Sequence, residues 1–345
     1  MTELSRHVKL SDGARLALPL VWLGQSVRTT VVTTRYPALG RECWMISLGD
    51  AVHRPRLIER VFCSDLRDRL RVRGPLMLDS GGFTMMMQER SLDVSEIATI
   101  YKRARVELCI SLDIPPTSKD SGRARARKYD KGQEYLAYLV DLVGPSKLVP
   151  VIHGLTETEV ARNCRQTADI FPHPLVICIG GLVPLLRRSG HDSMEHNRGF
   201  AWLQKFIAIA RAYFPAAIIH ILGAGSPKNV VTAIRCGADS TDSLAWRRAA
   251  GFGTIYLPGT GERFLGPRGR KRATSRPTLR RNEMELLAAC TCAACSEHPQ
   301  IDNRIAELSN SYIARAAHNA SVILEEAKRA APRLNDEHYH RTSRA

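Results

Sequence analysis

The stretch PLMLDSGGFT at residues 75–84 begins with a short apolar run, Leu76–Leu78, and passes directly into an aspartate, a serine and two glycines. A continuous apolar run of this kind is typical of a strand buried on both faces of a parallel sheet. Asp79 and Ser80 at its end fit two interpretations. Either they form a tight turn in which their side chains satisfy backbone donors, or they supply an acid beside a groove that binds a flat ligand. One copy of the pattern does not decide between the two.

Eight β-like runs recur along the first 245 residues, and most of them are continuous apolar runs. They are Val31–Thr34, Cys43–Leu48, Leu76–Ser80, Leu108–Asp113, Leu148–Gly154, Leu175–Gly181, Ile218–Gly223 and Ala238–Ser243. Helix-like segments such as VSEIATIYKRA, TETEVARNCRQTADI and AWLQKFIAIARAYF lie between most of them. Strands that alternate with helices indicate a parallel sheet, and about eight of them favour a (β/α)8 TIM barrel over an open doubly wound sheet.

Six of these runs end in polar or glycine residues. The ends are Asp79-Ser80-Gly81-Gly82, Asp113, His153-Gly154, Gly180-Gly181, Gly223-Ala224-Gly225 and Asp242. The carboxyl ends of the strands in a parallel barrel meet on one face, where active sites are built. The sequence therefore predicts one pocket with three carboxylates and glycine-lined walls. This favours an acid beside a groove over a simple turn as the interpretation of Asp79.

The composition indicates a basic globular protein with a polyanionic partner. The chain of 345 residues has a formal net charge of +16 and a pI near 9.8. Such an excess favours nucleic acid before a membrane surface. The start, MTELSRHVKL, lacks the apolar core of a signal peptide, and Leu175–Leu186 is too short to cross a bilayer. Six of the nine cysteines are scattered in mostly apolar surroundings, as in a cytoplasmic protein.

Two basic segments are expected at the surface. Arg123, Arg125, Arg127 and Lys128 follow the Asp113 run, where a loop over the pocket is expected. The segment Arg263–Arg281 holds eight Lys and Arg residues and no acid. A solvated loop and a contact with a phosphate backbone are equally good interpretations of it. The tail from Pro332 to Ala345 is expected to be disordered.

Three cysteines gather in CTCAACSEH, at Cys290, Cys292 and Cys295. Tetrahedral zinc needs a fourth N or S ligand. His298 is local, but a four-ligand site within nine residues is strained, whereas His318 on a helix-like stretch would join two segments. A closed set of three cysteines and one histidine leaves no open position, so the sequence predicts a structural zinc. The alternative is three incidental cysteines in an alanine-rich helix.

Taken in order, these motifs resemble those of the tRNA-guanine transglycosylase family. They are DSGGF (Asp79–Phe83), GGL (Gly180–Leu182), GAGSP (Gly223–Pro227), GADSTD (Gly237–Asp242), CTCAAC (Cys290–Cys295) and the pair His318-Asn319. Each motif is weakly specific by itself, but the ordered set over about residues 75–320 is specific. The resemblance implies a (β/α)8 catalytic barrel, expected here over residues 1–285. It also implies a small zinc-binding subdomain with a closing helix, expected over 286–331.

The resemblance also implies roles for individual residues. Asp242 corresponds to the nucleophile and Asp79 to the general acid/base. A carboxylate that captures the sugar carbon covalently divides one difficult displacement into two. The positions that correspond to the base-binding wall are Asp113, Gly180, Gly181 and Leu182, and Ser80, Gly81, Gly82 and His153 are also expected at the base. A strand-end histidine held by the backbone is an equally good interpretation of His153. The zinc ligands correspond to Cys290, Cys292, Cys295 and His318.

The chain departs from the family pattern on the substrate side. Thr84 follows DSGGF in place of the family's Gln, His153-Gly154 replaces its Gln-Gly pair, and Val183-Pro184 follows GGL. The family's Pro-Thr-Arg stretch is replaced by Ser243–Arg248. These departures favour the DpdA branch, whose members insert 7-deazaguanine bases such as 7-cyano-7-deazaguanine into DNA. Residues expected at the nucleic acid are Trp246, Arg247, Arg248, Arg268, Arg270, Lys271 and Arg272, with Trp246 either stacking on a base or packing in the core.

Three other functions fit less well. An enzyme of the same chemistry that acts on tRNA is the main alternative, because no residue excludes it. A non-catalytic nucleic-acid-binding subunit would not need both Asp79 and Asp242. A zinc-dependent barrel hydrolase would need histidines at the strand ends, and His153 and His220 form no paired motif. The resemblance further implies a helper ATPase as a partner; a homodimer is also expected, and no membrane partner.

Overall fold

The computed structural model describes residues 7–331, apart from 11–12, 14, 52–53, 63–65, 83, 85–92, 118, 182–192 and 267–276. The expectations for Leu182, Arg268, Arg270, Lys271, Arg272 and the tail 332–345 lie outside these described residues.

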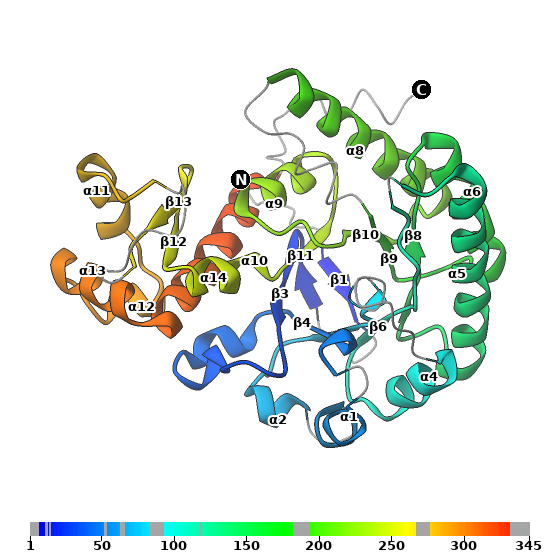
Figure 1. The fold of residues 1–345 in the computed structure, drawn as a ribbon, viewed down its shortest axis with the longest axis horizontal. Helices are drawn as coiled ribbons and strands as arrows, with labels where there is room; N and C mark the ends of the chain where they lie inside the picture. Colours follow the sequence, from blue (N-terminus) through cyan, green and yellow to red (C-terminus); the bar gives the residue numbers. More distant parts are fainter. Residues whose placement is uncertain are drawn as a thin grey trace.

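A parallel sheet of nine short strands curls into a barrel at the centre of the molecule (Figure 1). The strands are β3 (Leu20–Gln25), β4 (Trp44–Ser47), β5 (Leu76–Asp79), β6 (Leu108–Ile110), β7 (Leu148–Val149), β8 (Val151–Ile152), β9 (Val176–Ile179), β10 (Ile218–Ile221) and β11 (Ser240–Ser243). Their order, β7-β6-β5-β4-β3-β11-β10-β9-β8, leaves β7 and β8 at the two ends of the sheet, with only Pro150 between them in the chain. Because proline lacks an N–H for the ladder, β7 and β8 are one strand interrupted at Pro150. The sheet therefore has eight strand positions, and the (β/α)8 barrel is confirmed.

One of the eight expected strands is wrong. Val31–Thr34 is not a strand, because Val32–Thr34 form a short 3-10 helix, η1, and Val32 and Thr33 are buried. Its place in the barrel is taken by β3, which pairs with β4 on one side and β11 on the other. The β-branched residues at 31–34 favour a strand locally, but the Thr33 hydroxyl donates to the Leu70 carbonyl and packing fixes the segment outside the sheet.

Helices surround the barrel and cover its outer face (Figure 1). They are α1 (Pro55–Phe62), α2 (Leu66–Leu70), α4 (Val94–Arg103), α5 (Gly122–Val143), α6 (Glu157–Ile170), α8 (Ser193–Tyr213), α9 (Pro227–Arg235) and α10 (Ala245–Gly251), with the 3-10 helices η2 (Pro37–Arg41) and η3 (Leu48–Asp50). Side-chain caps begin several of them, as when Asp93 accepts from the Ser95 N–H and Thr156 from the Glu159 N–H. The three helix-like segments named from the sequence fall on α4, α6 and α8.

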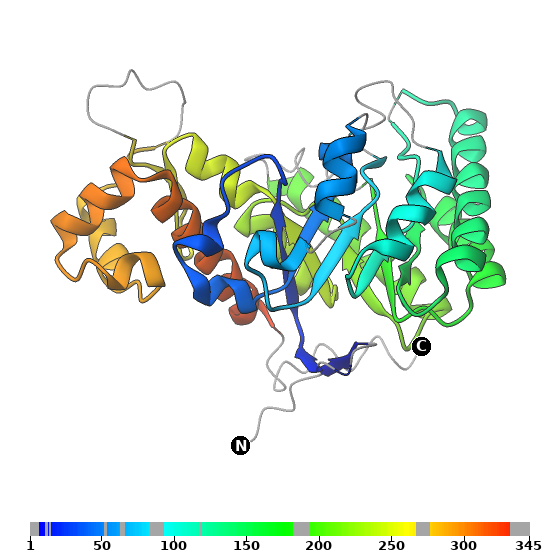
Figure 2. The ribbon, with the colours of Figure 1, turned by 90° about the horizontal axis from the view of Figure 1, so that it is seen from below.

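The interior of the barrel is an apolar cluster that includes Trp22, Met77, Val149 and Cys178. A hairpin of β1 (His7–Lys9) and β2 (Arg15–Ala17) adds Val8 to this cluster. Figure 2 shows the hairpin below the barrel, where the chain enters β3. Since β1 and β2 lie at the amino ends of the strands, they close that end of the barrel and leave the carboxyl ends for a site.

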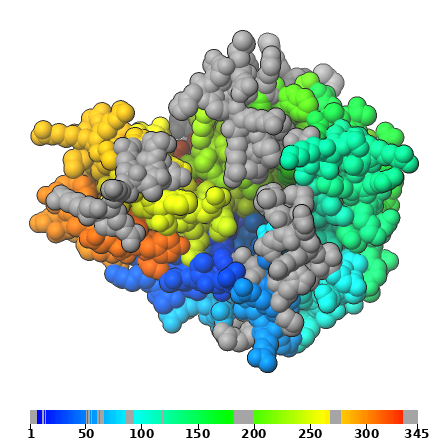
Figure 3. All heavy atoms as spheres, viewed as in Figure 1, coloured from blue at the N-terminus to red at the C-terminus, as the bar shows by residue number. Residues whose placement is uncertain are grey.

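The chain after α10 forms a second group of elements beside the barrel. It contains the hairpin β12 (Thr254–Leu257) and β13 (Gly261–Phe264), then η4 (Arg281–Glu283), α11 (Met284–Ala288), α12 (Ala293–Ser296), α13 (Ile301–Asn310) and α14 (Tyr312–Ala330). Helix α14 packs on α9, α10 and β12, and so joins this group to the barrel. Figure 3 shows the group as a lobe at one side of the molecule. The expected division at residue 285 stays a prediction.

Candidate active site

The Asp79 carboxyl lies at the end of β5, and its ionisation is unusual. Burial among protein atoms raises its pKa to about 7; the neighbouring Asp113 and Asp242 also raise it, while hydrogen bonds from the Ser47 hydroxyl and the Gly81 N–H lower it. Three carboxylates from separate strands therefore share one field, as the sequence predicts. A carboxyl with a pKa near 7 both gives and takes a proton at neutral pH.

The two glycines after Asp79 permit close backbone contacts. Gly81 has a φ of +81°, and a Cβ there would come within 2.3 Å of the Gly49 nitrogen. A Cβ on Gly82 would come within 2.3 Å of an oxygen of the Asp113 carboxylate. Glycine is needed at both positions because the η3 turn and Asp113 fill that space. The base-binding role expected of Ser80, Gly81 and Gly82 stays a prediction, since these contacts are with the protein itself.

Asp113 and His153 form a hydrogen-bonded pair across the strand ends. His153 Nε2 lies 2.8 Å from Asp113 Oδ2, and the Ser80 hydroxyl lies 3.4 Å from Asp113 Oδ1. Among the described residues, the buried Nδ1 of His153 has no hydrogen-bond partner. Gly180 and Gly181 both lie beside that nitrogen, because a Cβ would lie 3.2 Å from it on Gly180 and 3.5 Å from it on Gly181. The structure thus brings Asp113, His153, Gly180 and Gly181 together.

Asp242 on β11 is buried, with 4% of its surface exposed. Its Oδ1 accepts a hydrogen bond from the Gly223 N–H at 2.6 Å and lies 3.3 Å from His220 Nε2. The turn Gly223–Gly225 after β10 therefore holds the carboxylate. Its other oxygen, Oδ2, makes no hydrogen bond to the described part of the chain. The protein fixes Oδ1 by these contacts, and Oδ2 is the oxygen that is available to react.

The three residues expected to contact nucleic acid after Asp242 differ in exposure. Trp246 is fully buried on α10, with its ring edge against Trp44 at a centroid distance of 6.0 Å, so its ring cannot stack on a nucleobase. Arg247 is 5% exposed and donates to Gln25, to the Thr30 carbonyl and to the Tyr312 hydroxyl. Of the two interpretations of Trp246, packing in the core is the one that the structure shows, whereas the expected nucleic-acid contact of Arg247 is wrong. Both side chains lie on the face of α10 that packs inward. Arg248 is exposed.

Arg248 borders a cavity of about 260 Å³ between α9 and α10. The ring of Phe252, which is 54% exposed, lies on the same wall, and Gly225 and Ser226 bring the cavity close to the turn that holds Asp242. A cation and an exposed aromatic ring are the side chains that single-stranded nucleic acid contacts.

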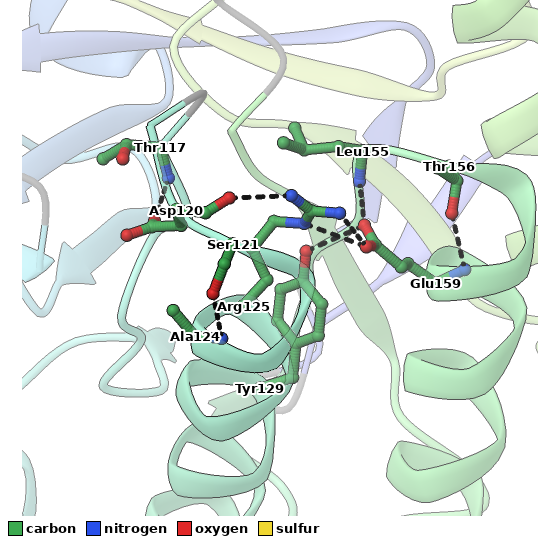
Figure 4. A network of polar contacts seen from close by, with 9 residues as sticks. All are labelled: Thr117, Asp120, Ser121, Ala124, Arg125, Tyr129, Leu155, Thr156 and Glu159. Atoms are coloured by element: carbon green, nitrogen blue, oxygen red, sulfur yellow. Dashed lines mark hydrogen bonds and ion pairs between the residues drawn. The ribbon is translucent and has the colours of Figure 1, made fainter.

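The expected basic loop after Asp113 is instead the first turns of α5, which begins at Gly122. Arg125 donates two hydrogen bonds to Glu159, and Tyr129 donates to the same carboxylate (Figure 4). Lys128 pairs with Asp120 at 2.7 Å. These partners hold the segment that carries Asp113 against α5 and α6, so Arg125 and Lys128 stabilise the site from outside it.

A second cluster, the Cys3His cluster, lies away from the carboxylates. The Sγ atoms of Cys290, Cys292 and Cys295 lie 3.5, 3.6 and 3.3 Å from His318 Nδ1, and all four ligand atoms lie within 4.8 Å of one another. Separations of roughly 3.3–3.8 Å are those of a tetrahedron with bonds of about 2.0–2.3 Å. His318 Nε2 lies 2.8 Å from the Tyr256 carbonyl, which fixes the proton on Nε2 and leaves the Nδ1 lone pair for a metal.

The donor set fits a closed zinc site. His318 rather than His298 completes it, as the sequence indicates, and the loop at Cys290–Cys295 is thereby tied to α14. No other group of metal-ligating side chains is found in the described residues, so a barrel hydrolase with metal at the strand ends has no support there.

Two positions in the site were not recognised from the sequence. Ser47 and His220 contact Asp79 and Asp242, respectively, but they come from β4 and β10. For His220, the signal available in the sequence was the alternation Ser240-Thr241-Asp242. It places Ser240 and Asp242, the two partners of His220, on one face of β11.

The fold and site define a class: a (β/α)8 barrel with a carboxylate cluster at the carboxyl ends of its strands and a Cys3His cluster beside the closing helix. A family model described as queuine tRNA-ribosyltransferase matches residues 46–344, and the chain belongs to this family.

The similar curated proteins are named tRNA-guanine(15) transglycosylase. The one from Pyrococcus abyssi is 29% identical over 263 residues, which is 74% of this chain and 39% of that protein. The one from Methanopyrus kandleri is 26% identical over 71% of this chain and 48% of its own length. The one from Methanothermobacter thermautotrophicus is 25% identical over 82% of this chain and 39% of its own length. The chain thus spans less than half the length of these relatives.

None of the described helices is long and apolar enough to cross a membrane.

Proposed function

We propose that this protein is a guanine transglycosylase that exchanges a guanine in nucleic acid for a free base through a covalent Asp242 intermediate. The observation that carries the proposal is the pair Asp79 and Asp242. One carboxyl has a pKa of about 7, and the other is held through Oδ1 with Oδ2 without a protein partner among the described residues. The membership of the chain in the family described above supports the same chemistry.

The proposed reaction is balanced by these two residues. Asp242 Oδ2 attacks the sugar carbon, the bond from that carbon to the guanine nitrogen breaks, and Asp79 gives the departing base a proton. An incoming base then returns a ring proton to Asp79, and its nitrogen displaces Asp242 from the same carbon. Two displacements restore the original configuration. Asp113 is proposed to bind the base edge, and His153 beside it lies against the Gly180-Gly181 turn.

The polymer favoured by the relatives is tRNA, because every relative named above carries tRNA in its name. The sequence by itself favours DNA and a 7-deazaguanine as the incoming base. DNA therefore stays the second candidate, and the observation behind it is His153, a substrate-side departure that lies inside the site. A structural zinc at Cys290, Cys292, Cys295 and His318, a helper ATPase, a homodimer and the cytoplasm belong to the same proposal.

The test offers labelled guanine to the protein with unmodified tRNA or with duplex DNA and measures label in the polymer. Asp242→Ala should abolish incorporation and also the covalent protein–polymer species on a denaturing gel. Asp141→Ala changes an exposed carboxylate on α5 and is the matched control, with activity within about twofold of the parent. Label in DNA alone would overturn the tRNA assignment. Label that survives Asp242→Ala would overturn the mechanism.

A further inference from the structure

A buried histidine lies directly against the proposed nucleophile. His220 is completely buried in the barrel interior, and its Nε2 lies 3.3 Å from Asp242 Oδ1. Its Nδ1 lies 2.9 Å from the Ser240 hydroxyl, which in turn accepts a hydrogen bond from the Trp22 indole at 3.0 Å. The row Trp22–Ser240–His220–Asp242 thus connects the apolar interior of the barrel to the carboxylate.

The strand register explains why these residues meet. His220 on β10 is the direct partner of Ser240 on β11, and Trp22 on β3 is the direct partner of Asp242. Side chains two residues apart on a strand point to the same face, so Ser240 and Asp242 both point into the barrel. Cys178 on β9 pairs with His220 on its other side. The four side chains therefore stand in two adjoining interior layers.

The hydrogen-bond directions can be assigned from chemistry. An indole nitrogen only donates, so the Ser240 oxygen accepts from Trp22 and keeps its own proton to give. Within the described chain, that hydroxyl has His220 Nδ1 as its one acceptor. Nδ1 therefore carries the lone pair, Nε2 carries the proton, and Nε2–H donates to Asp242. The other tautomer would set a lone pair against a carboxylate oxygen.

We infer that His220 is a positioning residue that holds the Asp242 carboxylate through Oδ1, with Oδ2 turned toward the sugar carbon. This inference rests on the proposed function. Together with the Gly223 N–H, the His220 Nε2–H gives Oδ1 two donors. In the first displacement, the donors fix the direction of attack. In the second, the C–Oδ2 bond breaks, the electron pair returns to the carboxylate, and the same donors stabilise the charge that reappears. His220 keeps its proton throughout.

Packing alone does not account for a histidine at position 220. Apolar residues line the rest of the interior, so an apolar side chain at 220 would fill the space at least as well. An imidazole in this position is costly to bury unless each nitrogen has a partner, and here Ser240 is the partner of Nδ1 and Asp242 is the partner of Nε2. The chemistry of the nucleophile, rather than packing, accounts for it.

Three variants test the inference. His220→Phe removes both hydrogen bonds, His220→Gln keeps a side-chain N–H donor, and Ser240→Ala removes the hydroxyl that sets the tautomer. The turnover of His220→Phe should fall about 10- to 100-fold with the KM for guanine within about threefold, because the base site at Asp113 is separate. Ser240→Ala should fall less, and His220→Gln should recover part of the loss. Equal losses in His220→Phe and His220→Gln would overturn the inference.

The pH profile is the readout that packing would not move. A hydrogen-bond donor favours the charged form of the carboxylate that it contacts, so the acidic limb of kcat/KM should move to higher pH in His220→Phe. The titratable groups that interact with Asp242 from the neighbouring elements are Asp79, Cys178 and His220. Asp113, which pairs with His153, interacts with Asp79. An acidic limb at the parental pH in a folded His220→Phe protein would also overturn the inference.

A measurement without substrate separates this inference from the proposed function. Histidine ¹⁵N NMR reports which ring nitrogen carries the proton, and His220→Gln assigns the signal by its disappearance. The Nε2–H tautomer is expected in the parent, with a mixture in Ser240→Ala. An Nδ1–H signal would overturn the positioning role even in an active enzyme. A parent that shows the Nε2–H signal but exchanges no base in either polymer would overturn the proposed function alone.

Discussion

Asp79 links the chemistry of the site to the stability of the fold. Its pKa is raised from 3.8 to about 7 in the folded protein, and burial is the largest cause. A group whose pKa is raised on folding binds its proton more tightly in the folded state. The stability that it contributes is therefore present at low pH and is lost as the pH rises through about 7. At pH 8, a buried charge at Asp79 opposes folding.

We expect Asp79→Asn to stabilise the protein at pH 8 by about 1–3 kcal/mol while it abolishes base exchange. The gain should shrink as the pH falls to about 5, because the parental Asp79 then carries its proton. Urea unfolding at the two pH values measures both. Asp141→Asn on the exposed face of α5 is the control for loss of a carboxylate. A gain that is the same at both pH values would contradict the raised pKa.

Single residues also mark the limit of what the sequence predicts. Asp79, Asp113 and Asp242 were recognised because each lies at or just beyond the carboxyl end of a strand, and a barrel brings such ends together. The choice between base stacking and core packing for Trp246 stayed open because the sequence does not tell which face of the short helix α10 packs inward. His220 was not recognised because its partners, Ser240 and Trp22, are distant in sequence and meet only through strand register.

At the scale of elements, continuous apolar runs were enough to predict seven of the eight strand positions, because parallel strands are buried on both faces. The run Leu20–Leu23 was missed, and Val31–Thr34 was chosen instead on its β-branched composition. At Val31–Thr34, packing outweighs the local preference for a strand, since Val32 and Thr33 are buried outside the sheet.

The Cys3His cluster makes a prediction about α11–α13. Its ligands come from the short loop around α12 and from α14, which itself packs on the barrel. A metal held there ties the outer lobe to α14, so about one zinc per chain is expected by metal analysis. Removal of the metal with a strong chelator should lower the melting temperature and speed proteolysis in α11–α13.

Matched cysteine variants make that experiment specific. Cys292→Ser should lose the metal and reproduce the effect of the chelator. Cys236→Ser changes a buried cysteine at the end of α9 that is not part of the Cys3His cluster and should keep the metal. Unchanged metal content in Cys292→Ser would show that the metal is held elsewhere.

At the scale of the whole molecule, the net charge of +16 predicts that binding to nucleic acid weakens steeply with salt. Arg125 and Lys128 are already paired with Glu159 and Asp120, so they add little to that binding. Exposed Arg248, at the cavity near the Asp242 turn, is placed to contact a phosphate. Arg235 ends α9 at the opposite end of the barrel and is equally exposed.

Arg248→Ala is therefore expected to weaken binding and to reduce the slope of log affinity against log salt by about one, the loss of one phosphate contact. Arg235→Ala removes the same charge from the whole molecule but not from the site, so its slope should stay at the parental value. Affinities for tRNA and for duplex DNA between about 50 and 200 mM salt measure both variants. Equal slopes for the two variants would mean that net charge alone drives binding. The proposal that nucleic acid binds at the face formed by the carboxyl ends of the strands would then be wrong.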